Sequence, residues 1–164
     1  MRDRPLSRGF TLVEALLASV ILAMAVVALA ASLGAGHMAS YEADEGRRAT
    51  GLAEELAEYV LALPYYDPQG HTTPGPEADE GSVAAYDNAD DFDGYVDPEG
   101  PLRGLKGDPY PTEYQVFRRS VSAQYGVVAV GGLGGVQGLR VVVEVRDARG
   151  RTWQVTRFIA EPID

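Results

Sequence analysis

Residues 8–14 read RGFTLVE, and they open an apolar run that lasts to about Leu33. Between Phe10 and Leu33 the only ionisable side chain is Glu14. At about 1.5 Å per residue such a run forms a helix about 36 Å long, enough to cross a hydrocarbon core about 30 Å thick. Three arginines precede the run, so the positive-inside rule keeps residues 1–9 in the cytoplasm and sends the rest of the chain outside. A carboxylate inside a membrane helix is costly, which makes Glu14 a candidate functional residue.

The stretch from Gly9 to Glu14 resembles the signal of type IV pilins and type II secretion pseudopilins. In that family a short basic leader ends in glycine, and phenylalanine, threonine, leucine, an aliphatic residue, glutamate and a long apolar run follow. The resemblance implies that residues 1–9 are a leader, cleaved between Gly9 and Phe10 by a prepilin peptidase, and that Phe10 is then N-methylated. It also implies that Glu14 meets the amino group of a neighbouring subunit's first residue during assembly. A carboxylate and an ammonium cost less in a low dielectric when they are paired than when each is alone.

Two other interpretations of this stretch remain. It could be a plain membrane anchor in which Glu14 reaches back to the headgroups. It could also be a secretory signal peptide, since residues 28–30 form a small-x-small cleavage site after a basic N-terminus. The apolar run continues past the usual length of such a signal and contains Glu14, and both features argue against the second interpretation.

Composition limits the function classes. The chain has 164 residues, which allows one domain in addition to a membrane helix. Its net charge of −10 disfavours nucleic-acid binding, which depends mainly on neutralising phosphates. It has no cysteine, and here it departs from the many pilins that carry a C-terminal disulfide. Two histidines without cysteine partners are poor evidence for zinc, and no nucleophile motif stands out, so we expect no enzyme.

The chain is expected to have an α+β fold, with a long N-terminal helix packed on a small antiparallel sheet. Residues 10–33 form the transmembrane half of the helix and residues 34–63 the second half, which Pro64 ends. Leu52, Leu56, Tyr59, Val60 and Leu63 recur at helical spacing and predict one apolar stripe. Gly34 and Gly36 suggest a bend or local melting where the helix leaves the membrane.

Residues 64–112 are rich in proline and glycine, and we expect a long surface segment that aromatic side chains hold against the head. Residues 113–164 predict the antiparallel sheet. A strand over 113–124 is followed by a second strand, or a continuation, over 125–130, and then by a glycine-rich loop over 131–135. The most regular alternation starts at Leu139 and leads through a turn at 147–150 into a partner strand over 151–160, with Trp153 and Val155 on the buried face.

Residues 87–99 hold the one candidate ligand site, because clustered carboxylates around a glycine turn suit a hard cation such as calcium. An EF-hand alignment fails at both ends, where Ala89 and Gly100 stand at ligand positions. The alternative is a solvated acidic turn with Phe92 and Tyr95 packed inward. Residues 90–95 also resemble a segment of some minor pilins of the mannose-sensitive-haemagglutinin type. The candidate calcium ligands are Asp87, Asp90, Asp91, Asp93 and Asp97, whose mutual repulsion predicts a partly mobile loop unless a cation or a neighbour's arginines compensate.

The resemblance therefore implies a structural minor pilin or pseudopilin. It would be inserted once in the inner membrane, processed by a prepilin peptidase/N-methyltransferase and assembled with other pilin or pseudopilin subunits into a filament. The signal does not separate a type IV pilus from a type II secretion pseudopilus. The rival from another class is a membrane-anchored or secreted binding domain that uses the acidic segment, residues 87–99. This rival predicts no cleavage after Gly9. Arginines at positions 118, 119, 140, 146, 149, 151 and 157 are read as a solvated strand face or as a contact with a neighbour's acidic segment.

Overall fold

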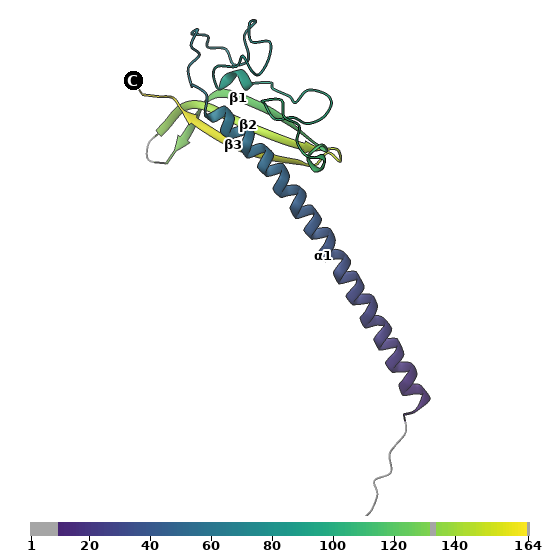
Figure 1. Ribbon diagram of the computed structural model, residues 1–164. Helices are drawn as coiled ribbons and strands as arrows, with labels where there is room; N and C mark the ends of the chain where they lie inside the picture. The colour runs from purple at the N-terminus through teal and green to yellow at the C-terminus, as the bar shows by residue number, and fades with distance from the viewer. Residues whose placement is uncertain (1–9, 132–133, 164) are drawn as a thin grey trace, which may run out of the picture. The chain divides into compact units, whose positions relative to one another are not determined.

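The computed structural model describes residues 10–131 and 134–163 (Figure 1). The chain divides into two compact units, Met1–Asp44 and Glu45–Asp164, which we take one at a time. The described part of the first, residues 10–44, is called the N-terminal unit below, and that of the second is called the head. Helix α1 (Leu12–Leu61) starts in the N-terminal unit and ends in the head.

From Leu12 onward the N-terminal unit is a single helical stretch of α1, and all the side chains of the unit are exposed. Its apolar side chains point outward on every side: Leu22, Met24 and Val27 are 66%, 69% and 69% exposed. Among the described residues, α1 is the one helix long and apolar enough to cross a membrane. The local melting expected at Gly34 and Gly36 is absent, because helical structure continues through both. A glycine costs about 1 kcal/mol in a helix, which the flanking alanines and leucines offset.

In the head, α1 buries one side against the sheet. Leu52, Leu56 and Val60 are at most 2% exposed, which confirms that part of the predicted stripe, whereas Tyr59 is 37% exposed. Three fully buried alanines, at positions 49, 53 and 57, complete the buried face of the helix. The helix ends at Leu61, two residues earlier than the sequence indicated.

The sheet has three antiparallel strands in the order β1 (Phe117–Val130), β2 (Gly134–Asp147) and β3 (Thr152–Ala160). In the central strand Leu139, Val141, Val143 and Val145 are fully buried, as their alternation predicts. Their cross-strand neighbours continue the core: Val143 lies opposite Val121 in β1 and Val155 in β3. The predicted α+β fold, a long apolar helix packed on a small antiparallel sheet, is confirmed.

Two strand boundaries differ from the predicted ones. The first strand was expected from residue 113, but Thr112–Tyr114 form a short 3-10 helix, η2, after Pro111, and β1 starts only at Phe117. β1 then runs unbroken to Val130, so residues 125–130 are a continuation of the same strand. β2 begins at Gly134, within the expected glycine-rich loop, of which residues 132–133 lie outside the described part.

The turn between β2 and β3 has the expected chemistry. The Gly150 amide donates a hydrogen bond to the Asp147 carbonyl oxygen at 3.0 Å. Gly150 has φ 84°, a left-handed conformation that favours glycine. Further along the sheet, Gly138 allows an unusually close approach: a Cβ built there would lie 2.2 Å from the Ile159 carbonyl oxygen. Gly126, its partner across β1 and β2, faces open space.

Residues 62–116 form a long connection over the head, with one more 3-10 turn, η1 (Asp90–Phe92). Phe92 is fully buried, and the rings of Tyr59, Tyr86 and Tyr95 pack against it with centroids 5.9, 5.0 and 5.5 Å away. Aromatic side chains thus hold the connection, as expected. Residues 94–97 also pair with the outer edge of β1, where the Val121 amide donates to the Tyr95 carbonyl oxygen at 2.9 Å. This pairing covers an edge that would otherwise expose unpaired backbone groups.

Candidate functional sites

The N-terminal motif starts α1 through a capping box. Thr11, directly before the helix, donates from its backbone amide and from Oγ1 to Glu14 Oε2, at 2.9 and 3.0 Å. In return the Glu14 amide donates to Thr11 Oγ1 at 3.2 Å. This reciprocal arrangement satisfies backbone donors that a helix start leaves unpaired. Sequence reasoning gave Glu14 an assembly role alone, although a threonine three residues before a glutamate is the signature of this cap.

The structure describes one of the two residues at the predicted processing site. Phe10 is 82% exposed, with its backbone just before the cap, whereas Gly9 and the rest of the leader lie outside the described residues. Cleavage between Gly9 and Phe10, and methylation of Phe10, remain predictions.

The predicted metal ligand Asp97 belongs to a buried ion pair. Arg119, which is 1% exposed, donates from Nη2 to Asp97 Oδ1 at 2.9 Å and from Nε to Oδ2 at 3.1 Å. Asp97 Oδ2 also accepts the Arg119 backbone amide at 2.7 Å, and Tyr95 donates from its hydroxyl to Oδ1 at 2.9 Å. Arg119 was expected on a solvated strand face, and that prediction is wrong. It lies in phase with Phe117 and Val121 on the inward face of β1, where only a carboxylate partner makes a guanidinium tolerable.

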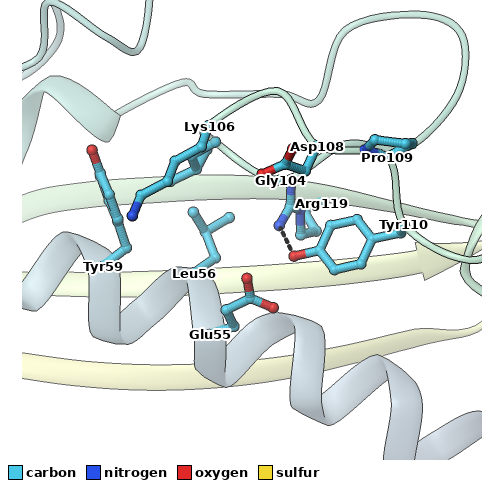
Figure 2. Close-up of a pocket in the computed structure, with 10 residues that line it drawn as sticks. Glu55, Leu56, Tyr59, Gly104, Lys106, Asp108, Pro109, Tyr110 and Arg119 are labelled. Atoms are coloured by element: carbon cyan, nitrogen blue, oxygen red, sulfur yellow. Dashed lines mark hydrogen bonds between the residues drawn. The ribbon is translucent and has the colours of Figure 1, made fainter.

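A pocket of about 330 Å³ opens beside this pair, between α1 and residues 104–110 (Figure 2). Arg119 donates from Nη1 to the Tyr110 hydroxyl at 3.3 Å across its wall. Burial and the nearby Glu55 raise the pKa of Tyr110 to about 12, so this phenol stays a neutral donor and acceptor. Glu55 and Lys106 also line the pocket with opposite charges. The lining therefore shows no preference for an anion or a cation.

Three of the other predicted ligands already have partners of their own. Asp90 accepts the Tyr125 hydroxyl at 2.6 Å, Asp93 accepts the Ala123 amide at 2.8 Å, and Asp87 accepts the Gln69 side-chain amide at 3.0 Å. Asp90 and Asp97 are buried rather than solvated, so the acidic segment is not a simple solvated turn, although Phe92 and Tyr95 do pack inward. Calcium binding by the predicted five carboxylates remains a prediction.

Two groups of potential metal ligands occur within residues 10–131 and 134–163, and both include Glu77, which sequence reasoning did not single out. In the first group, His71 Nδ1 lies 3.0 Å from Asp67 Oδ2 and 3.2 Å from Glu77 Oε1. The hydrogen bond to Asp67 raises the pKa of His71 despite partial desolvation. The second group is Glu77, Glu80 and Asp91, and Asp91 is the one predicted ligand in either group. Burial and the neighbouring Glu77 raise the pKa of Glu80.

The C-terminal arginines mostly meet acids of the head itself. Arg151 donates from Nε to Asp147 Oδ2 at 2.8 Å and also binds Glu45 of α1, which ties the β2–β3 turn to the helix. Arg149 lies 3.8 Å from the same glutamate. Burial alone would raise the pKa of Asp147, but hydrogen bonds from Arg151 and from the Arg149 amide outweigh it and lower the pKa.

Residues 4–30 match the family model described as the prokaryotic N-terminal methylation motif. The chain carries the type IV pilin/pseudopilin signal. This motif supports a type IV pilin-like or pseudopilin precursor, and the apolar helix near the N-terminus fits a membrane anchor. The family that shares the motif is structural rather than catalytic. Comparisons with curated proteins and with solved structures give no match.

Proposed function

We propose that this chain is a structural minor pilin or pseudopilin that is processed at its N-terminus and assembled into a filament. The observation that carries the proposal is the methylation motif at residues 4–30, which includes the start of α1 at Leu12. The side chains of the N-terminal unit are all exposed, and from Phe10 to Leu33 most of them are apolar. They need a membrane before assembly and apolar contacts with other subunits after it.

In this proposal the leader stays in the cytoplasm and the head is outside, as the arginines before the helix favour. A prepilin peptidase cuts after Gly9 and methylates Phe10. The partners are this enzyme, the inner membrane and other pilin or pseudopilin subunits. The protein is a substrate of the processing enzyme and not an enzyme itself.

Glu14 has two roles in succession in this proposal. In the single chain its carboxylate caps α1 through Thr11. During assembly it pairs with the amino group of a neighbour's Phe10. A subunit that uses this pairing has a neighbour along the filament axis, so we propose that it is not confined to the extreme tip.

Processing is tested by the intact mass of the chain, purified from membranes of cells that express a prepilin peptidase. The expected species starts at methylated Phe10. Gly9→Val should keep its leader, whereas Gly34→Val, the same change in an exposed part of α1, should be processed like the wild type. A wild-type chain that keeps its leader, or one that starts near Ala31, would overturn the proposal.

Assembly is tested with Glu14→Val, which still inserts because it makes the helix more apolar. It should be depleted from sheared filaments, while Glu42→Val, the same change farther along the exposed helix, should be present at the wild-type level. Glu14→Val at the wild-type level in sheared filaments would refute the pairing. A chain that keeps its leader and enters no filament would favour the rival, a membrane-anchored binding domain.

A further inference from the structure

Three carboxylates of the connection lie close together, and none of them has a role in the proposed processing or filament assembly. Glu77, Glu80 and Asp91 each offer one oxygen, and these oxygens lie within 4.8 Å of one another. Glu80 and Asp91 are 6% and 0% exposed, while the side chain of Glu77 is 17% exposed. The group therefore combines two buried carboxylates with one that faces solvent in part.

Each of the two buried carboxylates has one oxygen fixed by the backbone and one oxygen without a partner. Asp91 Oδ2 accepts the amides of Asp87 and Asn88 at 2.9 and 3.0 Å, and Glu80 Oε2 accepts the Glu77 amide at 3.1 Å. Glu80 Oε1 and Asp91 Oδ1 are buried and accept no hydrogen bond. Buried polar atoms are nearly always paired, and an unpaired carboxylate oxygen is costly, so these two oxygens call for a ligand.

We propose that Glu77, Glu80 and Asp91 bind a hard divalent cation of the calcium type. Oxygen ligands lie about 2.3–2.6 Å from Ca²⁺, so two ligands of one ion are at most about 5 Å apart, and the observed group meets this limit. Three carboxylates also supply the charge that a divalent ion requires. Water can complete the coordination shell from the side on which Glu77 is exposed.

The backbone contacts hold the buried ligands in place without the ion. Asp91 belongs to η1, which Phe92 anchors in the core, and the amide of Asn88 fixes its orientation. Asn88 Nδ2 is also buried without a partner, but it is a donor and therefore cannot be a ligand of the ion. Glu77 Oε1 lies 3.2 Å from His71 Nδ1, so a protonated His71 competes with the cation for this carboxylate.

This site is distinct from the five aspartates that the sequence suggested, of which it keeps Asp91 alone. Asp97 is committed to Arg119, and Asp93 to the Ala123 amide. The proposed site and the five aspartates therefore differ in which single substitutions should weaken calcium binding.

The experiment is calorimetric titration of CaCl₂ into the full chain in a neutral detergent, after removal of metals with a chelator. We expect one Ca²⁺ per chain, with a dissociation constant of about 10⁻⁴–10⁻³ M as in extracellular calcium modules. MgCl₂ at the same concentration controls for charge screening. Glu80→Gln and Glu77→Gln should each weaken binding at least about tenfold, since ligand charge sets the affinity.

The matched control is Glu99→Gln, which removes one negative charge from an exposed position in the same connection and should bind like the wild type. Asp93→Asn should also bind normally. The fluorescence of Trp153, the one tryptophan, reports whether each variant is folded, and Glu77→Gln keeps the test valid if Glu80→Gln does not fold. Absence of calcium binding by the wild type, or wild-type affinity in folded Glu77→Gln, would overturn the site.

Discussion

The two parts of α1 share one helical geometry and differ in where their apolar side chains go. In the N-terminal unit Leu22 is 66% exposed, and in the head Leu56 is 1% exposed. Both are leucines on the same helix, so local propensity does not distinguish them. The difference lies in their surroundings: the chain itself supplies a sheet for the second part, whereas the first needs a membrane or other subunits.

This comparison indicates that the stability of the head depends on contacts inside one chain, and that the N-terminal unit depends on its environment. Substitutions in the head should therefore change the free energy of unfolding of the head, and substitutions in the N-terminal unit should not. Trp153 is half-buried in the head, with its ring centroid 6.0 Å from that of Phe117. Its fluorescence during urea unfolding of the detergent-solubilised chain reads the head alone.

The largest effect on the free energy of unfolding is expected from breaking the buried ion pair between Arg119 and Asp97. Arg119→Leu leaves Asp97 buried without its partner and should cost the head about 3–5 kcal/mol of unfolding free energy. Glu14→Leu, which removes a charge from the N-terminal unit, should leave this free energy unchanged. Replacing Arg119 and Asp97 together by leucine should recover part of the loss, because the pair then leaves no isolated charge. A loss below about 1 kcal/mol for Arg119→Leu, as at a surface site, would contradict the prediction.

The two leucines test the comparison directly. Leu56→Ala should destabilise the head by about 2–5 kcal/mol, through lost burial and the cavity that remains. Leu22→Ala should not change the urea midpoint. Equal effects of the two substitutions would mean that the N-terminal unit and the head unfold as one.

A smaller effect sharpens the picture of packing within the sheet. Gly138→Ala places a methyl group against the Ile159 carbonyl oxygen and should cost about 1–3 kcal/mol through overpacking. Gly126→Ala, its cross-strand partner, meets open space and should change the free energy by less than about 0.5 kcal/mol. If the two variants unfold at the same urea concentration, the close approach of β2 and β3 is not a constraint.

The smallest effect is a pH dependence. The pKa of Asp147 is lower in the folded head than in the unfolded chain, so its contribution to stability is complete above the unfolded pKa and is lost as the pH falls through the folded pKa. Acid unfolding of the wild type should therefore show a component that Asp147→Asn lacks. Asp108→Asn, at an exposed position, serves as the control and should keep it. An unchanged acid limb in Asp147→Asn would refute the linkage.

The sequence predicted the elements whose patterns are strict. The alternation from Leu139 to Val145 and the spacing of Leu52, Leu56 and Val60 each indicate one buried face, and the structure agrees. Arg119 broke the alternation of β1 and was read as solvated. Its phase with Phe117 and Val121 was the available signal, but its partner, Asp97, lies 22 residues earlier and could not be inferred from local spacing.

The connection over the head, residues 62–116, was the least predictable region, because its sequence has no periodicity to indicate which side chains turn inward. Asp93 and Asp97 look alike in the sequence, yet Asp97 meets a buried guanidinium and Asp93 meets backbone on β1. Glu77 and Glu80 stand outside the densest cluster of carboxylates, so the sequence did not predict them as ligands. Tertiary contacts brought them to Asp91.

The pairing of residues 94–97 with the edge of β1 has a consequence for the order of folding. β1 and β2 can pair progressively from their adjoining ends, where Val130 lies opposite Gly134. β3 can then pair with β2 across a short turn. The connection must instead close longer loops, such as the one between Asp90 and Tyr125, which are 35 positions apart in the sequence. Closing longer loops costs more entropy, so we expect the strands to pair first and the connection to dock late. In stopped-flow refolding, Val143→Ala should then slow folding, whereas Asp97→Asn should mainly speed unfolding.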